Sequence, residues 1–412
     1  MDLDHAEIRR YSRHLVLEDV GIAGQRRLKA TSVLCVGSGG LGSPALTYLA
    51  AAGIGTIGVV DDDVVEESNL QRQVVHSTRA VGEPKVDSAA ERVAGLNPHV
   101  AVRKHAVRLT SGNALELIRP YDVVLDGCDN FPTRYLVNDA CVLLGKPLIY
   151  GAVQKFEGQV SVFNYRGGPN YRDIFPEPPP PGEVPSCSEA GVLGVLPGVI
   201  GTLQATEAIK VALGMEEGTL SGRLLLYDAL RLKFNEIRVA RRDGAPPITS
   251  LVDYQGFCGG KKPASRGADA ASEARSSAPD AAAPAEPFER IGVVEASRRM
   301  REEGWTPFTL DVRTRMEAEI VSLPFADLQQ PHRTVDRIVS ALPPGRDVLV
   351  HCKSGVRSAA ACHTLAALGV GHGGGKSLGE GAAAGAAPPR LYSLDGGITG
   401  WAREIDTTMP TY

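Results

Sequence analysis

Short apolar runs alternate with amphipathic segments through the first half of the chain. Strands are expected at 33–36, 56–60, 100–104 and 122–126, and helices from Gly40, from about Pro84 and near 111–118. This alternation predicts an α/β fold with a doubly wound parallel sheet, which binds ligands at the carboxyl ends of its strands. A further helix is expected within residues 5–18, where apolar positions recur at helical spacing between charged ones.

The pattern changes after Tyr150. A period of two over 158–165 predicts an antiparallel extension of the sheet. Residues 176–191 are rich in proline, which lacks a backbone donor, so we expect an exposed loop there that carries Cys187. A helix at about 199–213 and strands within 222–240 complete the first domain.

A change in composition divides the chain. Residues 261–287 are rich in Ala, Ser, Pro and charge and have no apolar periodicity, which predicts a flexible linker. We therefore expect one domain at 1–260 and a second, smaller one at 288–412. Within the second, residues 372–390 form a low-complexity stretch that we interpret as a surface insertion.

Composition excludes some classes of partner. The 412 residues have a net charge of −4 and a pI near 6.2, which argues against nucleic acid as the main ligand. The charged N-terminus and the lack of an apolar run of about eighteen residues favour a cytoplasmic protein without a membrane segment. The seven cysteines are an odd number without an export signal, so free thiols are expected.

A glycine-rich turn follows the first strand. Gly37, Gly39 and Gly42 have the spacing of a loop that opens a helix next to a phosphate, because glycine permits a sharp turn and a close backbone approach. Asp61 ends the second strand, where an acid can accept ribose hydroxyls. A plain packing turn would show the same spacing, so the loop by itself does not identify a nucleotide.

Three charged residues favour ATP over NAD. Arg72, Lys85 and Asp129 all follow strand ends or open the next helix, so they should converge near the glycine loop. Two cations can neutralise a leaving pyrophosphate and an acid can hold Mg²⁺. Singly, each has a structural alternative, namely a cap for Arg72, a solvated helix start for Lys85 and an N-cap for Asp129. Hydride transfer would need no such cluster.

Residues 5–258 resemble the MoeB/ThiF-type adenylyltransferases, which are relatives of ubiquitin-activating enzymes. The resemblance rests on GSGGLG, VVDDDVVEESNLQRQ, GEPKVDSA, DGCDN and GVIGTLQATEAIK. It implies a Rossmann-like ATP domain that adenylates the Gly-Gly carboxylate of a ubiquitin-like sulfur carrier protein. The residues that it implies for nucleotide and Mg²⁺ binding are Gly37, Gly39, Gly40, Gly42, Asp61, Asn69, Arg72, Lys85 and Asp129. It also implies a homodimer in which Arg13 reaches the ATP site of the other subunit.

The chain departs from many of these relatives at a structural zinc site. Such relatives carry two C-x-x-C pairs, whereas the first place here reads Asn170-Tyr171-Arg172-Asp173 and only Cys258 remains near the second. Tetrahedral zinc needs four N or S ligands. We therefore expect no structural zinc.

Cys352 lies between an apolar run, 347–351, and a helix expected from Ser358. Its loop, CKSGVR, places Cys352 at a helix N-terminus with Lys353 and Arg357 nearby, and such a setting stabilises a thiolate nucleophile. A buried inert cysteine is the alternative. Phosphatase loops have five residues between Cys and Arg, whereas four lie between them here.

CKSGVRSA, LDVR, DGGI and Trp401 resemble a rhodanese domain over about 288–412. The resemblance implies that Cys352 carries sulfur as a persulfide and that Arg357 and Lys353 hold a donor such as thiosulfate, with a cysteine desulfurase as another source. The whole chain resembles fused adenylyltransferase/sulfurtransferases of the MoeZ type. A persulfide can attack an acyl-adenylate, which gives a thiocarboxylate.

Release of the thiocarboxylate from Cys352 needs a second thiol. Cys187 lies in VPSCSEAGVLG, which resembles the family's cysteine segment, and is the candidate. The flexible linker should allow Cys352 to approach Cys187. Cellular thiols are the alternative.

Two other functions stay open, an NAD-dependent oxidoreductase with a sulfur-handling domain and a non-catalytic scaffold for sulfur carriers.

Overall fold

A computed structural model describes residues 2–179, 191–215, 217–258, 286–371 and 390–411. The chain divides into two compact units, residues 1–269 and 270–412. Cys187, nearly all of the expected linker and the 372–390 insertion except Arg390 lie outside the described residues. None of the described helices combines the length and hydropathy that a bilayer span needs.

The first unit contains an eight-stranded sheet with the order β3-β2-β1-β4-β5-β6-β7-β8. The strands are β1 (Ser32–Val36), β2 (Thr56–Val60), β3 (Ala101–His105), β4 (Val123–Asp126), β5 (Leu148–Gln154), β6 (Glu157–Phe163), β7 (Arg223–Asp228) and β8 (Lys233–Arg238). The first five are parallel, and β6, β7 and β8 continue antiparallel from β5. The predicted doubly wound sheet with an antiparallel extension is therefore confirmed.

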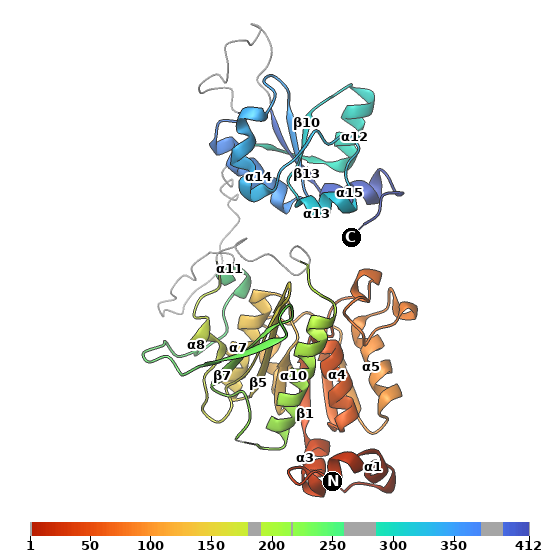
Figure 1. Ribbon diagram of the computed structural model, residues 1–412, viewed down its shortest axis with the longest axis vertical. Coiled ribbons are helices and arrows are strands. Elements are labelled where there is room, and N and C mark those ends of the chain that lie inside the picture. Colours follow the sequence, from red (N-terminus) through yellow and green to blue (C-terminus); the bar gives the residue numbers. More distant parts are fainter. Residues whose placement is uncertain (1, 180–190, 216, 259–285, 372–389, 412) are drawn as a thin grey trace, which may run out of the picture. The chain divides into compact units, whose positions relative to one another are not determined.

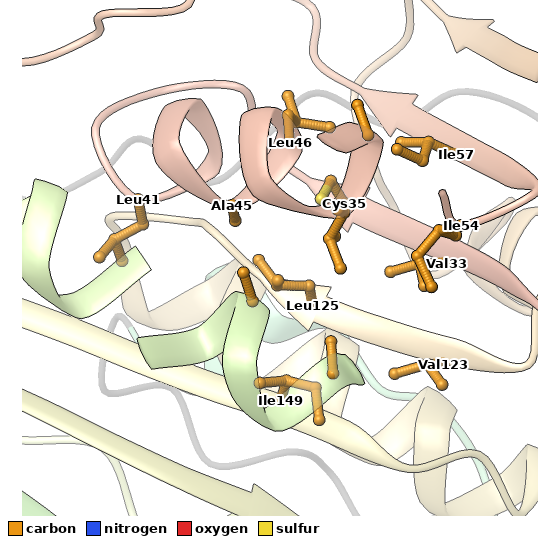
Figure 2. Close-up of a cluster of buried hydrophobic side chains, with 14 of the residues drawn as sticks. Val33, Cys35, Leu41, Ala45, Leu46, Ile54, Ile57, Val123, Leu125 and Ile149 are labelled. Carbon is orange, nitrogen blue, oxygen red and sulfur yellow. The ribbon is translucent and has the colours of Figure 1, made fainter. Parts of the chain in front are cut away.

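Two hydrophobic cores sandwich this sheet, because successive side chains of a strand point to opposite faces. Val33 and Cys35 of β1 belong to one core, and Leu34 and Val36 belong to the other. Figure 2 shows Cys35 near Leu46 and Val33 near Ile54, all four in the first core. Helices α4 (Gly42–Ala52), α5 (Lys85–Leu96) and α10 (Val195–Ala212) cover the first core, and α6 (Ala114–Ile118), α7 (Phe131–Leu144), α8 (Tyr171–Ile174) and α11 (Tyr254–Cys258) cover the second.

Three N-terminal helices pack at the amino edge of the sheet: α1 (His5–Arg10), α2 (Ser12–Leu15) and α3 (Gly21–Ala30) (Figure 1). Arg10 donates to the carbonyl of Leu96 at the end of α5, and Gln25 donates to that of Ala52 at the end of α4. Since α4 and α5 run back from the carboxyl edge, these carbonyls mark the opposite edge. The helix expected within 5–18 is interrupted at Tyr11, whose hydroxyl accepts a hydrogen bond from Asn97.

The second unit is a five-stranded parallel sheet with the order β11-β10-β12-β13-β9. Its strands are β9 (Glu289–Gly292), β10 (Phe308–Asp311), β11 (Leu328–Gln329), β12 (Val348–His351) and β13 (Leu391–Asp395). The helices are α12 (Val293–Glu302), α13 (Arg315–Ile320), α14 (Val356–Ala367) and α15 (Gly397–Glu404), with a 3₁₀ segment at His332–Ala341. Separate apolar clusters pack on its two faces.

Candidate active sites in the two units

The glycine loop connects β1 to α4 and is in close contact with the turn after β4. Gly37 has a φ of 92°, and a Cβ there would lie 2.9 Å from the carbonyl oxygen of Gly127. A Cβ on Gly42 would collide with the carbonyl oxygen of Gly37. Glycine is therefore required at both positions, and Gly39 and Gly40 lie between them in the same loop. The helix begins at Gly42, two residues later than we expected.

Asp61 is hydrogen-bonded to the glycine loop. Its Oδ2 accepts hydrogen bonds from the backbone N–H and the hydroxyl of Ser38, at 2.8 and 2.9 Å. The buried ring of His76 bonds the Ser38 carbonyl and the Ser88 hydroxyl. Burial lowers the pKa of His76, so a neutral ring is favoured. Ser38 and His76 were missed from the sequence, where no residue spacing connects them.

The segment between β2 and α5 places cations beside this loop. Lys85 is buried and its Nζ lies 2.8 Å from Oδ2 of the exposed Asp63. Arg72 is half-buried and donates to the carbonyl of Ser68, while the buried Asn69 accepts from the backbone N–H of Glu66. A buried ammonium with one exposed carboxylate partner can serve an anionic ligand at the carboxyl edge of the sheet.

Asp129 is exposed in the turn that follows β4. Asn130, not Asp129, is the N-cap of α7, because its side chain accepts from the N–H of Thr133 at 3.0 Å. The structural alternative for Asp129 is therefore wrong. Its carboxylate has the oxygen ligands that Mg²⁺ prefers, and Gly127, two residues earlier in the same turn, contacts Gly37 of the glycine loop. The turn thus offers one carboxylate to a metal–nucleotide ligand at the carboxyl edge of the sheet.

Arg134 holds the turn that presents Asp129, and sequence reasoning did not identify it. Its Nε lies 3.2 Å from Oδ2 of Asp126 and its Nη2 donates to the carbonyl of Cys128 at 3.1 Å. Burial alone would lower the pKa of Arg134, but the neighbouring Tyr150 and Asp126 keep it above its ordinary value. The turn therefore rests on a buried charge pair.

The structure does not bring Arg13 to the ATP site of its own chain. Arg13 is exposed on α2, at the amino edge of the sheet, whereas the glycine loop lies at the carboxyl edge. Large exposed apolar side chains lie three and four positions after it, with Val16 at 78% and Leu17 at 52% exposure.

An ion pair holds the segment 170–173, where the resemblance led us to look for zinc ligands. Arg172 makes two hydrogen bonds to Asp139, at 2.8 and 2.7 Å, and Tyr254 donates to the same carboxylate at 2.7 Å. Asn170 and Asp173 form the capping box of α8. Burial raises the pKa of Cys258 to about 11, so its thiol stays protonated. These residues do not form a tetrahedral zinc ligand set.

Cys352 lies in the loop between β12 and α14 and is only 1% exposed. The backbone N–H of Gly355, which has a φ of 105°, lies 3.1 Å from its sulfur. The start of α15 closes the loop, since Ile398 and Thr399 donate to the carbonyls of Cys352 and Lys353. A Cβ on Gly397 would clash with both carbonyls. The loop thus aims a backbone donor at the sulfur, as a thiolate requires.

Arg357 is not open to solvent as an anion-binding side chain. It is 8% exposed and makes two hydrogen bonds to Glu317 of α13, at 2.8 and 2.7 Å. Burial alone would raise the pKa of Glu317, but hydrogen bonds from Arg357 and the Thr314 backbone lower it to about 2. The pair is therefore ionised at neutral pH. Lys353 is partly exposed in the same loop.

Comparisons with known proteins agree with both sites. The ThiF family model matches residues 11–247, and the rhodanese-like domain model matches residues 293–404. The probable adenylyltransferase/sulfurtransferase MoeZ of Mycobacterium tuberculosis (strain H37Rv) is 44% identical, covering 100% of this chain and 96% of the relative. MOCS3 of Anopheles gambiae is 41% identical, covering 100% and 90%. The sulfur carrier protein adenylyltransferase of Thermus thermophilus is 56% identical, covering 61% and 97%.

Solved structures share the fold of the first unit. E. coli MccB has a TM-score of 0.53 at 21% identity, over 61% of this chain and 75% of that one. PaaA has a TM-score of 0.51 at 22% identity, over 58% and 76%. At such identities the likeness shows the fold alone. The two family matches and the full-length relatives make this chain an adenylyltransferase and sulfurtransferase, and it belongs to the ThiF family with a rhodanese-like domain at its C-terminal end.

Proposed function

We propose that the chain activates the C-terminal Gly-Gly carboxylate of a ubiquitin-like sulfur carrier protein with ATP and then converts it to a thiocarboxylate. One observation carries the proposal: a glycine loop, a buried Lys85 and an exposed Asp129 gather at one sheet edge of a chain that also holds a loop-bound Cys352. The relatives named for both activities support the same pairing.

In the adenylation step, a carboxylate oxygen of the carrier attacks the α-phosphorus of ATP and pyrophosphate leaves. Lys85 and Arg72 neutralise the charge that develops on the leaving group, and Asn69 and Asp61 orient the phosphates and the ribose. Mg²⁺, bound through Asp129, would screen the phosphate charge. The Gly37–Gly127 contact keeps the Asp129 turn beside the phosphate loop.

In the sulfur step, the Cys352 thiolate attacks the sulfane sulfur of a donor. An S–S bond to Cys352 forms as the donor's bond breaks, and the donor leaves as sulfite from thiosulfate or as a thiolate from a cysteine desulfurase persulfide. The terminal sulfur then attacks the acyl-adenylate carbon and AMP leaves. This produces an acyl disulfide between the carrier and Cys352.

A second thiolate, which we assign to Cys187, attacks the Cys352 sulfur of this acyl disulfide. The carrier leaves as a thiocarboxylate, and a Cys187–Cys352 disulfide remains that a cellular dithiol reduces. Because free thiols must persist through this cycle, we place the reaction in the cytoplasm.

We also propose a homodimer in which Arg13 completes the ATP site of the partner subunit. Two observations support it: Arg13 lies at the edge away from its own site, and Val16 and Leu17 expose apolar surface next to it. Exposed apolar patches of this kind mark protein interfaces.

The test is ATP–pyrophosphate exchange with a purified carrier that ends in Gly-Gly. We expect exchange that depends on the carrier, and a loss of about a hundredfold or more in Asp129→Ala. Cys352→Ala is the matched control, because it should keep exchange and lose sulfur transfer from thiosulfate to cyanide. Absence of exchange, with NAD rather than ATP binding by calorimetry, would refute the proposal.

A further inference from the structure

Three buried side chains line the inner side of the Cys352 loop. Ser358 of α14 and Ser393 of β13 are both 0% exposed, and Cys352 is 1% exposed. The Ser358 hydroxyl oxygen lies 3.7 Å from the Cys352 sulfur and 3.0 Å from the Ser393 hydroxyl oxygen. Ser358 also donates to the carbonyl of Gly355 at 2.9 Å. The hydroxyls therefore form a chain that leads from the sheet to the sulfur.

The hydrogens of this chain can be counted. A serine hydroxyl has one hydrogen to donate and two lone pairs. With Cys352 as a thiol, the S–H and the Ser393 hydroxyl both donate to Ser358, whose own hydrogen goes to Gly355. When Cys352 loses its proton, the sulfur becomes an acceptor. The Ser358 hydrogen is then free to rotate from the Gly355 carbonyl to the sulfur, because Ser393 still donates to the Ser358 oxygen.

Ser393 lies outside the sequence motif of the Cys352 loop. It lies on β13, between the apolar Tyr392 and Leu394, and is separated from Ser358 by 35 positions. Burying a hydroxyl costs free energy unless it is hydrogen-bonded. Its hydrogen bond to Ser358 satisfies the Ser393 donor and leaves Ser358 with its own hydrogen available.

We propose that Ser393 is a positioning residue which, through Ser358, directs a hydroxyl hydrogen at the Cys352 thiolate. The proposal rests on the proposed role of Cys352 as the sulfur-bearing nucleophile. The hydrogen bond stabilises the thiolate that attacks the donor. It weakens once the sulfur is bonded in a persulfide, because that sulfur carries less negative charge. The two hydroxyls thus favour the thiolate that is formed before loading and is regenerated when the Cys187–Cys352 disulfide is reduced.

The experiment measures alkylation of Cys352 by iodoacetamide against pH in the full-length protein, quantified on the Cys352 peptide by mass spectrometry. We expect Ser393→Ala and Ser358→Ala to move the midpoint of the profile upward by about one pH unit, the tenfold effect of one hydrogen bond to a charged group. Ser393→Thr keeps the hydroxyl and should restore the wild-type midpoint. The charged and titratable groups around the loop are unchanged in every variant: Lys353, Arg357, Glu317, His351 and Asp311.

Ser297→Ala is the matched control, since Ser297 is a buried serine on α12, outside the Cys352 loop and the Ser358–Ser393 hydrogen bond, and its loss should leave the profile unchanged. A wild-type profile in Ser393→Ala, with its fold verified by circular dichroism, would overturn the proposal. A shift in Ser358→Ala alone would remove Ser393 from the mechanism. Persulfide formation from thiosulfate in the wild-type protein, measured by mass, tests the role of Cys352 separately.

Discussion

Arg172→Ala should strongly destabilise the first unit. Arg172 connects α8 to Asp139 of α7, and Tyr254 of α11 donates to the same carboxylate. The guanidinium also lies 4.9 Å from the ring centroids of Tyr135 and Phe257. The Arg172 side chain therefore connects three helices.

The magnitude follows from burial. Asp139 is 3% exposed and Arg172 is 21% exposed, so removing the cation leaves a buried carboxylate whose remaining side-chain donors are Tyr254 and Asn138. Breaking a buried pair costs roughly 3–5 kcal/mol, and the partial exposure of Arg172 places this case at the lower end, near 3 kcal/mol. For a unit of this size that corresponds to a fall of about 6–12 °C in melting temperature.

The assay is differential scanning calorimetry of the full-length protein. Tryptophan fluorescence would not report this transition, because Trp305 and Trp401 both lie in the second unit. Arg231→Ala is the matched control, since its pair with Asp228 is on the surface at 71% exposure and its loss should leave the melting temperature unchanged. The reasoning would be refuted by equal effects of the two variants. About one zinc per chain by elemental analysis, with EDTA lowering the melting temperature of the wild type, would refute it too.

Three further predictions concern the second unit and the catalytic cycle. The pKa of Glu317 is about 2 against an ordinary 4.5, so its ionised carboxylate stabilises the folded second unit above pH 4.5, and this stabilisation is lost as the pH falls toward 2. Glu317→Gln should therefore reduce the fall in melting temperature on the acid side, and an unchanged slope of melting temperature against pH would count against this role. Cys187→Ala should accumulate a carrier–Cys352 disulfide on non-reducing gels, and normal turnover without dithiol would exclude the relay. Mixing the Arg13→Ala and Asp129→Ala proteins should restore ATP–pyrophosphate exchange to about a quarter of wild type, because half of the dimers are then mixed and each mixed dimer has one of its two sites intact. No recovery after subunit exchange would argue against a site shared between subunits.

Local features of both units could be predicted from the sequence. The strand expected at 56–60 is β2, and the apolar runs at 33–36 and 122–126 are β1 and β4 to within one residue. The glycine loop, Asp61 and the Cys352 loop also follow from local pattern. These features depend on side-chain periodicity, on the backbone freedom of glycine and on the missing backbone donor of proline. Each of these effects involves residues close in sequence, so it can be recognised without knowing the fold.

The contacts that hold these sites in place came only from the tertiary structure. Arg134 bonding the Cys128 carbonyl, Arg172 pairing with Asp139 and Ser393 bonding Ser358 each depend on how separate elements pack. The N-terminal helices likewise place Arg13 away from its own glycine loop, which no spacing predicts. A buried polar group must find a partner, but the sheet order decides which residue is near enough to be that partner.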